Sequence, residues 1–555
     1  MREHFFGKYP KLKAMVADWT DDQIWALARG GHDAQKIYAA YSAAVSHRGQ
    51  PTVILAKTVK GYGMGEAGEG QNITHQQKKM GEAQLREFVN RFELPITDEQ
   101  LKEVPFIRFP EGSAEAEYLR ARRAALGGTM FQRRQKSASL EVPALSAFES
   151  QLKATEGRTI STTMVFVRIL NTLIRDKAIG KYVVPIVPDE SRTFGMEGMF
   201  RQFGIYSQVG QLYRPEDANQ LMFYKEDTKG QILQEGLNEP GAMSSWIAAA
   251  TSYSTNNLPM IPFYIYYSMF GFQRVGDLAW AAGDMRAHGF LLGATAGRTT
   301  LNGEGLQHED GHSHILSSTI PNCVSYDPTY SYEVAVIIQD GLRRMYKEQE
   351  DVFYYITLMN ENYEHPALPG GAEQGILKGM YLLREGDAAA KHRVQLLGSG
   401  TILREVIAGA DLLAQDYGIS ADIWSCPSFT EARREAMDIE RWNMLHPEET
   451  AKVSWVTQCL GGRPGPVIAS TDYIKIYADQ IRAWVPGRYR VLGTDGFGRS
   501  DYRSKLRSFF EVDRHFVALA ALQSLAAEGA VSPATCADAI KRYQIDPERR
   551  NPARS

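Results

Sequence analysis

Segments with helical spacing alternate with short apolar runs along most of the chain from residue 142 onward. Thr162–Asp176 repeats its apolar residues at the spacing of one helix face, and the β-branched segment Tyr182–Val187 follows it. Ile261–Tyr267, which reads IPFYIYY, has the length and aromatic content of a buried strand. Helices that alternate with buried strands are typical of α/β domains with a mostly parallel sheet. This alternation predicts the fold class before any single motif is considered.

The same alternation continues after a turn-rich break at Pro366–Gly371 (PALPGG). Val394–Leu397 and Val467–Ser470 are predicted strands, and the helix that begins after GSGT is predicted to stop at Gly418. A chain of 555 residues is too long for one hydrophobic core and is expected to form about two to four domains. We therefore expect a second α/β unit beyond the break.

The opening of the chain differs from the rest. Helical pieces precede one strand-like run, Pro51–Leu55 (PTVIL), and a long glycine-rich loop follows it. A helix is also expected near Ala114–Leu126, within a charged connector. A single strand without neighbours can neither pair its backbone nor bury its faces. The opening segment therefore has the pattern expected for the end of a domain that begins upstream of residue 1.

Composition and charge exclude several classes of protein. A formal net charge of −3 gives no sign of the basic surface that nucleic acids require. No apolar run approaches the roughly 18 residues needed to cross a bilayer, and the first residues lack an apolar core of signal-peptide length. The four cysteines are far apart and form no CxxC pair, which argues for a reducing compartment and against a cysteine metal site. We expect a cytoplasmic protein with no membrane or nucleic-acid partner.

A carboxylate, an aromatic run and a histidine cluster lie within 75 residues of one another. Glu239 stands between Asn238 and a Pro-Gly pair, just before the helix-like run Ala242–Ser254. The aromatic run is Ile261–Tyr267, and the histidine cluster is Leu301–His314 (LNGEGLQHEDGHSH). These groups are a reasonable start for an active site. The local sequence fits equally well a helix-start carboxylate beside core aromatics, so both interpretations stay open at this point.

Two other features have a simpler interpretation. His308–His312 (HEDGH) matches the HExxH pattern, so a zinc hydrolase acting through His308 and His312 is a remote alternative. That pattern binds zinc on a helix, where positions i and i+4 share a face, whereas Asp-Gly between the histidines is typical of a loop. His75 and Lys60 lie in polar loop sequence and, on composition alone, are expected to be solvated. No metal ligand is assigned from the sequence.

Several long motifs, in order along the whole chain, carry a family resemblance. They are HDAQKIYAAY, KTVKGYGMG, QNITHQQKKM, PDESRTFGMEGMFRQ, GLNEPGA, YYSMFGFQR, LNGEGLQHEDGHSH and TDGFGRSD. The chain resembles the bacterial, homodimeric first component of the pyruvate dehydrogenase complex. The resemblance implies a transketolase-like thiamine-diphosphate fold with a parallel-sheet pyrimidine-binding domain and a C-terminal α/β domain. It divides the chain into 1–138 (the end of the diphosphate-binding domain plus a connector), 139–368 (the pyrimidine-binding domain) and 369–555 (the C-terminal domain).

The resemblance also implies roles for individual residues. Glu239 is expected to hydrogen-bond the ring nitrogen of the cofactor's aminopyrimidine. His308 is expected to meet the carboxylate of pyruvate, with Glu304 supporting it. His75 is expected to act when the two-carbon unit passes to a lipoyl group. The residues implied in cofactor binding are Glu190, Tyr267, Phe270 and Lys60.

The implied reaction is oxidative decarboxylation of pyruvate and reductive acetylation of the lipoyl group of dihydrolipoamide acetyltransferase, by a homodimer. Its implied cofactors are thiamine diphosphate and Mg²⁺, which family members bind through a GDG motif followed by an Asn. This chain contains no GDG triplet. A diphosphate binds poorly without its metal and cationic partners, so a truncated chain that is inactive alone is expected. The alternative is a non-catalytic fragment for assembly or dimerisation.

Overall fold

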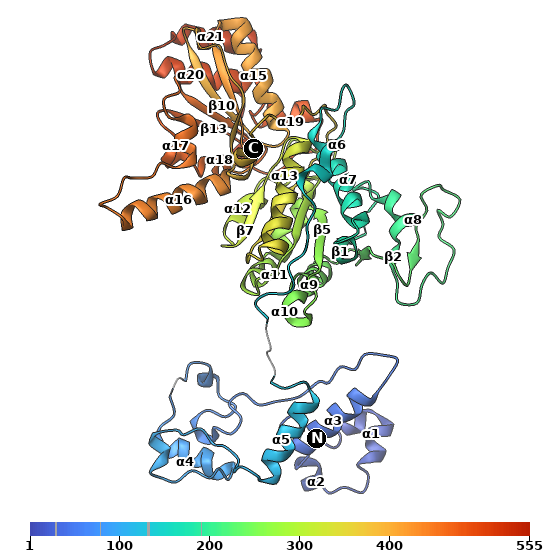
Figure 1. Ribbon diagram of the computed structural model, residues 1–555. Helices are drawn as coiled ribbons and strands as arrows, with labels where there is room; N and C mark the ends of the chain where they lie inside the picture. Colours follow the sequence, from blue (N-terminus) through green and yellow to red (C-terminus); the bar gives the residue numbers. More distant parts are fainter. Residues whose placement is uncertain (28–29, 78, 130–133, 190) are drawn as a thin grey trace. The chain divides into compact units, whose positions relative to one another are not determined.

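The computed structural model describes residues 1–27, 30–77, 79–129, 134–189 and 191–555. The chain divides into two compact units, Met1–Phe131 and Gln132–Ser555, and each is described here by itself. Figure 1 shows both units and labels their main elements. Within the described residues, no helix has the length and apolar character needed to cross a membrane.

The described residues of the first unit form helices and turns without a strand. Its longest helix carries the expected capping chemistry, since the Asp33 side chain accepts a hydrogen bond from the Lys36 amide at 3.0 Å. The helix expected near Ala114–Leu126 is confirmed. The helices are α1 (Pro10–Met15), α2 (Asp21–Trp25), α3 (Ala34–Ser46), α4 (Glu82–Arg91) and α5 (Ala114–Ala125).

The strand predicted at Pro51–Leu55 is wrong. These residues are extended coil, and the side chains of Val53 and Leu55 are 81% and 92% exposed. A strand forms only when a neighbouring strand accepts and donates its backbone hydrogen bonds. No described segment of the first unit offers that partner.

The second unit contains a six-stranded sheet in the order β4-β1-β5-β6-β8-β7, with every neighbouring pair parallel. Successive residues of β5 point to opposite faces: Phe263 and Ile265 enter one core, Tyr264 and Tyr266 the other. The strands are β1 (Val183–Val187), β4 (Leu233–Gln234), β5 (Ile261–Tyr267), β6 (Phe290–Ala294), β7 (Cys323–Tyr326) and β8 (Phe353–Thr357).

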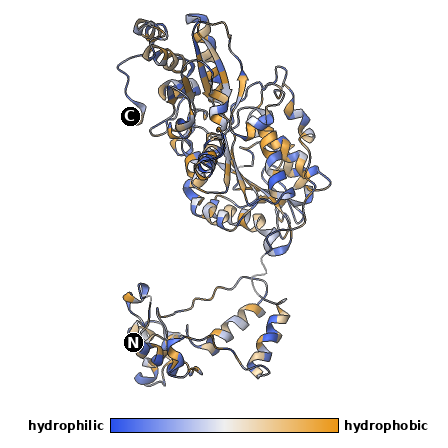
Figure 2. Ribbon diagram, turned by 60° about the vertical axis from the view of Figure 1, so that its left-hand side comes forward, coloured by the Kyte–Doolittle hydropathy of each residue, from blue (hydrophilic) through white to orange (hydrophobic). Residues whose placement is uncertain are grey.

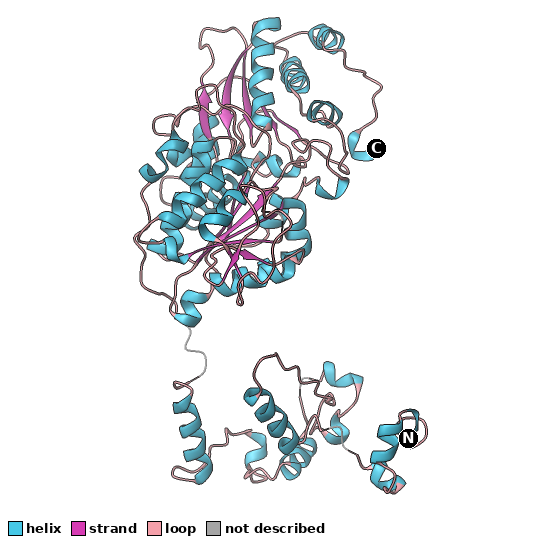
Figure 3. Cartoon of the chain, turned by 90° about the vertical axis from the view of Figure 1, so that its right-hand side faces the viewer, coloured by secondary structure: helices cyan, strands magenta, loops and turns pink. Residues whose placement is uncertain are grey.

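Helices cover both faces of this sheet, and the strands lie between them in Figure 3. Apolar residues of α7 and α13 pack on one face, and those of α9 and α11 on the other. Figure 2 shows helices of this unit with one hydrophobic and one hydrophilic side, as expected for such layers. The helices are α6 (Glu149–Leu152), α7 (Thr162–Arg175), α8 (Phe200–Phe203), α9 (Glu239–Ala250), α10 (Ser252–Asn256), α11 (Phe272–Asp284), α12 (Ser313–Ser318) and α13 (Ser331–Leu342). A small parallel pair, β2 (Ile205–Tyr206) and β3 (Glu226–Asp227), lies outside the sheet.

A five-stranded mixed sheet follows in the order β13-β12-β10-β11-β9, with β9 antiparallel to its neighbour. Its helix α15 stops where expected, because Gly418 takes the left-handed conformation at the C-cap. The strands are β9 (Tyr381–Arg384), β10 (Arg393–Gly398), β11 (Ser420–Ser425), β12 (Val467–Ser470) and β13 (Tyr489–Leu492). The helices are α14 (Glu373–Leu377), α15 (Ile402–Tyr417), α16 (Phe429–Leu445), α17 (Trp455–Leu460), α18 (Ile476–Asp479), α19 (Arg503–Phe509), α20 (Arg514–Ala527) and α21 (Pro533–Arg542). The predicted α/β fold class is therefore confirmed.

Candidate active site

Glu239 lies in the first turn of α9 and is only 7% exposed. The preceding Asn238 caps the helix by accepting a hydrogen bond from the Gly241 amide at 3.2 Å. The positive end of the helix dipole favours an anion at this position. Glu239 is thus a helix-start carboxylate, and its burial is what separates it from an ordinary one.

An arginine of helix α11 neutralises this carboxylate. The guanidinium of Arg274, in the first turn of α11, donates to the Glu239 carboxylate at 2.8 Å. The same guanidinium lies 3.9 Å from the centroid of the Phe270 ring. Tyr264 of β5 belongs to the same environment: burial raises the pKa of its hydroxyl, and the charge of Glu239 raises it further. Arg274 therefore connects the buried carboxylate to the aromatic residues after β5.

Three rings form a cluster at the carboxyl end of β5. Tyr267 stacks on His308 with ring centroids 4.9 Å apart, and Phe270 lies 5.2 Å from the same imidazole. Tyr267 and Phe270 meet edge to face at 5.7 Å, and Phe194 packs on Tyr267 at 5.5 Å. The carboxyl ends of parallel strands are where open α/β sheets bind their ligands. The cluster therefore occupies the expected place for a site.

His308 lies close to a carboxylate of its own loop. Its Nδ1 lies 3.3 Å from Glu304 Oε2. His308 ends a single 3₁₀ turn, Leu306–His308, and the helix α12 begins only at Ser313. The HExxH helix that a zinc hydrolase requires is therefore not formed, and the described residues contain no group of three or more side chains able to hold a metal.

The structure brings together part of the residues predicted for the site. Glu239, Tyr267, Phe270, His308 and Glu304 gather around the end of β5, as described above. Glu190, which was predicted to bind the cofactor, lies outside the described residues.

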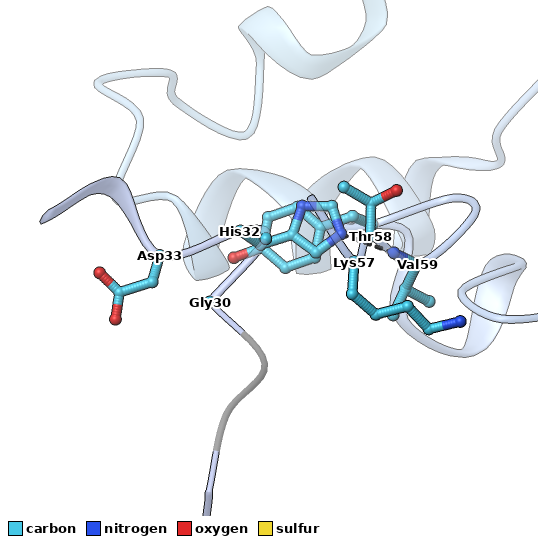
Figure 4. A pocket seen from close by; sticks show the side chains of 8 residues that line it. Gly30, His32, Asp33, Lys57, Thr58 and Val59 are labelled. Carbon is cyan, nitrogen blue, oxygen red and sulfur yellow. Dashed lines mark hydrogen bonds between the residues drawn. The ribbon is translucent and has the colours of Figure 1, made fainter. Parts of the chain in front are cut away.

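His75 and Lys60, which were also predicted, belong to the first unit and are both exposed. Lys60 comes directly after Val59 in the sequence, and Val59 is one of the residues that line the hollow of about 460 Å³ shown in Figure 4. The rings of His32 and Tyr62, which also line this hollow, stack 3.8 Å apart. The Val59 amide donates to His32 Nε2 at 2.7 Å, which fixes this loop locally.

Arg274 is the main residue that the sequence analysis missed. It is the last residue of the motif YYSMFGFQR. The sequence does show a cation directly after an aromatic run. It does not show that this cation pairs with Glu239, which lies 35 residues upstream. The pair becomes visible only once α9 and α11 pack on the same face of the sheet.

Comparison with known proteins gives two family models that match the second unit. Residues 140–366 match the pyruvate dehydrogenase E1 component middle domain, and residues 379–513 match the transketolase-like C-terminal domain. The whole chain is 67% identical to the pyruvate dehydrogenase E1 component of Cupriavidus necator, of which it covers 62%. The chain is therefore similar to this E1 component along its whole length.

A second E1 component shows the same relation. The E1 component of Escherichia coli K12 is 59% identical over 555 residues and is again covered to 62%. The chain thus spans about three fifths of the length of these curated relatives. Among solved structures, Campylobacter jejuni transketolase is 17% identical, with a TM-score of 0.60 over 89% of this chain and 66% of that chain. This likeness confirms the transketolase-like fold.

Proposed function

We propose that the chain contributes the pyrimidine-binding and C-terminal parts of a pyruvate dehydrogenase E1 site, with domains at 139–368 and 369–555 and a remnant at 1–138. The reaction is oxidative decarboxylation of pyruvate, followed by acetylation of the lipoyl group on dihydrolipoamide acetyltransferase. The observation that carries this proposal is the buried Glu239–Arg274 pair beside the ring cluster of Tyr267, Phe270 and His308. The similarity of the whole chain to E1 components supports it.

These residues suit one half of thiamine diphosphate. A flat aminopyrimidine needs an aromatic wall and a carboxylate at its ring nitrogen, and Tyr267, Phe270 and Glu239 supply groups of these kinds near one another. When bound, the cofactor supplies the electron sink for the decarboxylation. The proposed role of Glu239 is to hold a proton at the ring nitrogen of the aminopyrimidine. Its carboxylate is buried, so water is largely excluded from this position.

His308 is proposed to bind the substrate carboxylate. A carboxylate only accepts hydrogen bonds, so the imidazole has to donate to it from a ring N–H. The imidazole lies on Tyr267 and is only partly exposed, so its orientation is restricted before substrate arrives. His75 is proposed to serve acetyl transfer, while Lys60 and Glu190 are proposed to lie near the cofactor in a homodimer.

The diphosphate and its Mg²⁺ do not fit the residues present. The sequence contains no GDG triplet. The described residues hold no cluster of three or more side chains suited to a metal. No residue is therefore assigned to the metal, and no step is derived through it. This observation favours the second candidate, a non-catalytic fragment that assembles or dimerises.

Calorimetric titration of the chain with thiamine diphosphate and Mg²⁺ separates the two candidates. Binding in the micromolar range that Glu239→Gln weakens by about tenfold or more supports a pyrimidine site. Glu149→Gln is the matched control, because it changes an exposed carboxylate that pairs only with Lys153. Absence of heat from a chain that is folded by circular dichroism would favour the assembly role.

A further inference from the structure

A second cavity of about 670 Å³ lies in the second unit, beside the ring cluster. It is bounded by the histidine loop and by the loop after β13. Met269 and Leu306 line it, and they come from the same short turns that carry Phe270 and His308. The cavity thus shares a wall with the candidate active site, but the function proposed above uses none of its lining residues.

Glu309 is the unusual residue of this cavity. Its side chain lines the space, the residue is 1% exposed, and neither carboxyl oxygen has a hydrogen-bond partner among the described residues. The pKa of this carboxyl is raised to about 9, mainly by burial and also by the charge of Asp472, while the charge of Arg298 opposes the rise. The group is therefore protonated near neutral pH and offers an O–H donor. A buried polar group that lacks a partner costs about 1–3 kcal/mol, so its retention here calls for a reason.

The wall around Glu309 is fixed. Arg298 donates to the carbonyls of Thr494 and Gly496, both at 2.6 Å, and to the Glu309 carbonyl at 3.3 Å. A Cβ at Gly498 would lie 2.3 Å from Glu309 Cβ, so only glycine allows the loop after β13 to pack this closely. Glu309 therefore belongs to the wall of a preformed cavity rather than to a space that the loop can fill.

The charges of the lining favour an anion with an apolar body. Asp310 and Asp472 lie near Arg298 and balance its charge. Arg499 is the other cation that lines the cavity, and its guanidinium also donates to the backbone oxygen of Ser555 at 2.6 Å. A guanidinium matches a carboxylate, and a neutral carboxyl donates a hydrogen bond to one. Leu306 and Phe497 are 53% and 82% exposed and add apolar surface.

We propose that this cavity binds a small organic carboxylate, with its charged end at Arg499 and the Glu309 carboxyl and its apolar end on Leu306 and Phe497. The site is separate from the substrate position at His308 and does not depend on the function proposed above. Since Met269 and Leu306 belong to the turns that carry Phe270 and His308, a ligand here contacts the elements that position the ring cluster.

Equilibrium binding of sodium butyrate to the full chain tests the proposal, with butyramide and inorganic phosphate as comparison probes. Butyrate is expected to bind in the millimolar range. We expect it to bind at least tenfold more tightly than either comparison probe. Arg499→Gln and Glu309→Leu are expected to weaken butyrate at least tenfold, and Glu309→Gln less, because an amide still donates. Lys505→Gln, which removes an exposed cation outside the lining, is the matched control and should change nothing.

Three outcomes overturn the proposal. Equal binding of butyrate and butyramide would mean a merely apolar cavity, and tighter binding of phosphate would mean a site for inorganic anions. Loss of butyrate binding in His308→Ala would place the ligand in the candidate active site instead. Arg499→Gln changes a residue with a side chain at the cavity rim, so the test stands even where Glu309→Leu fails to fold. Thiamine diphosphate binding is measured separately, so failure of one proposal leaves the other intact.

Discussion

The two units differ in how far their apolar side chains are buried. In the second unit, Phe148, Phe166 and Trp246 are fully buried between helices and sheet. In the first, only six of the described hydrophobic residues are buried, and Phe106 is 98% exposed. Both units contain capped helices, so the difference does not come from helix-forming sequence. It comes from the sheet, which the second unit has and the described part of the first lacks.

This contrast predicts where stability resides. Burial of apolar area contributes about 25 cal/mol per Å², and isolated helices shorter than about 12–15 residues are marginal in water. The longest helix of the first unit, α3, has 13 residues and none of them is buried. The second unit should therefore unfold cooperatively, while the first contributes little to that transition.

Hydrogen exchange should show the largest difference between the units. Amides of β5 and β6 lie at the centre of the six-stranded sheet and should exchange only on global unfolding. Amides of α3 should exchange through local opening, faster by on the order of 10³-fold. Mass-spectrometric exchange of the full chain measures both regions in one sample. Similar protection of the α3 and β5 amides from exchange would contradict the proposed difference in stability between the units.

A matched pair of phenylalanine substitutions should show the next largest effect. Phe166→Ala in α7 removes a fully buried ring that contacts Phe263 at 5.8 Å between centroids. It should lower the free energy of unfolding of the second unit by about 3–5 kcal/mol. Phe106→Ala removes an exposed ring and should change the same quantity by less than about 0.5 kcal/mol. Urea titration followed by circular dichroism measures both, and equal losses would contradict the assignment of the core.

The same contrast explains what the sequence could predict. Ile261–Tyr267 and Val467–Ser470 are strands with the predicted bounds, because their apolar pattern meets parallel neighbours. Pro51–Leu55 has similar composition and fails, since pairing depends on distant residues that local pattern does not contain. Helix α13 begins at Ser331, because the Glu333 side chain accepts hydrogen bonds from the amides of Thr329 and Tyr330 and so caps the helix there.

The features of the candidate site also divide into those that local sequence predicts and those that it does not. Glu239, Tyr267, Phe270, His308 and Glu304 were expected from motifs that are continuous in sequence. The ion pair with Arg274 and the unpartnered carboxyl of Glu309 were not expected. Both depend on which helix or loop packs against the residue, and this is decided by the tertiary fold rather than by local sequence.

The pH dependence of stability should also separate the two units. The folded-state pKa of Glu309, about 9, lies above its unfolded value of about 4.3. The folded state therefore holds a proton that the unfolded state releases, and stability falls as pH rises from about 5 to 8. Glu309→Gln removes this pH-dependent loss of stability. The free energy of unfolding of the variant relative to the parent chain should therefore increase by up to about 4 kcal/mol between pH 5 and pH 8. Thermal unfolding at several pH values measures the difference.

Glu99→Gln in the first unit is the control for this titration, because Glu99 is exposed. Its effect on the main transition should not vary with pH. A stability difference between Glu309→Gln and the parent chain that stays constant from pH 5 to 8 would mean that the carboxyl of Glu309 titrates normally, and the description of its surroundings would be wrong.

The smallest expected effect uses the same capping bond in both units. Ser161 caps α7 by accepting from the Met164 amide at 3.2 Å, and Ser113 caps α5 by accepting from the Ala116 amide at the same distance. Replacing a serine cap by alanine costs about 1 kcal/mol of helix stability. Ser161→Ala should therefore lower the free energy of the main unfolding transition by about that amount. Ser113→Ala should leave it unchanged, because α5 belongs to the unit that does not share this transition; equal losses in chemical denaturation would show that the two units unfold together.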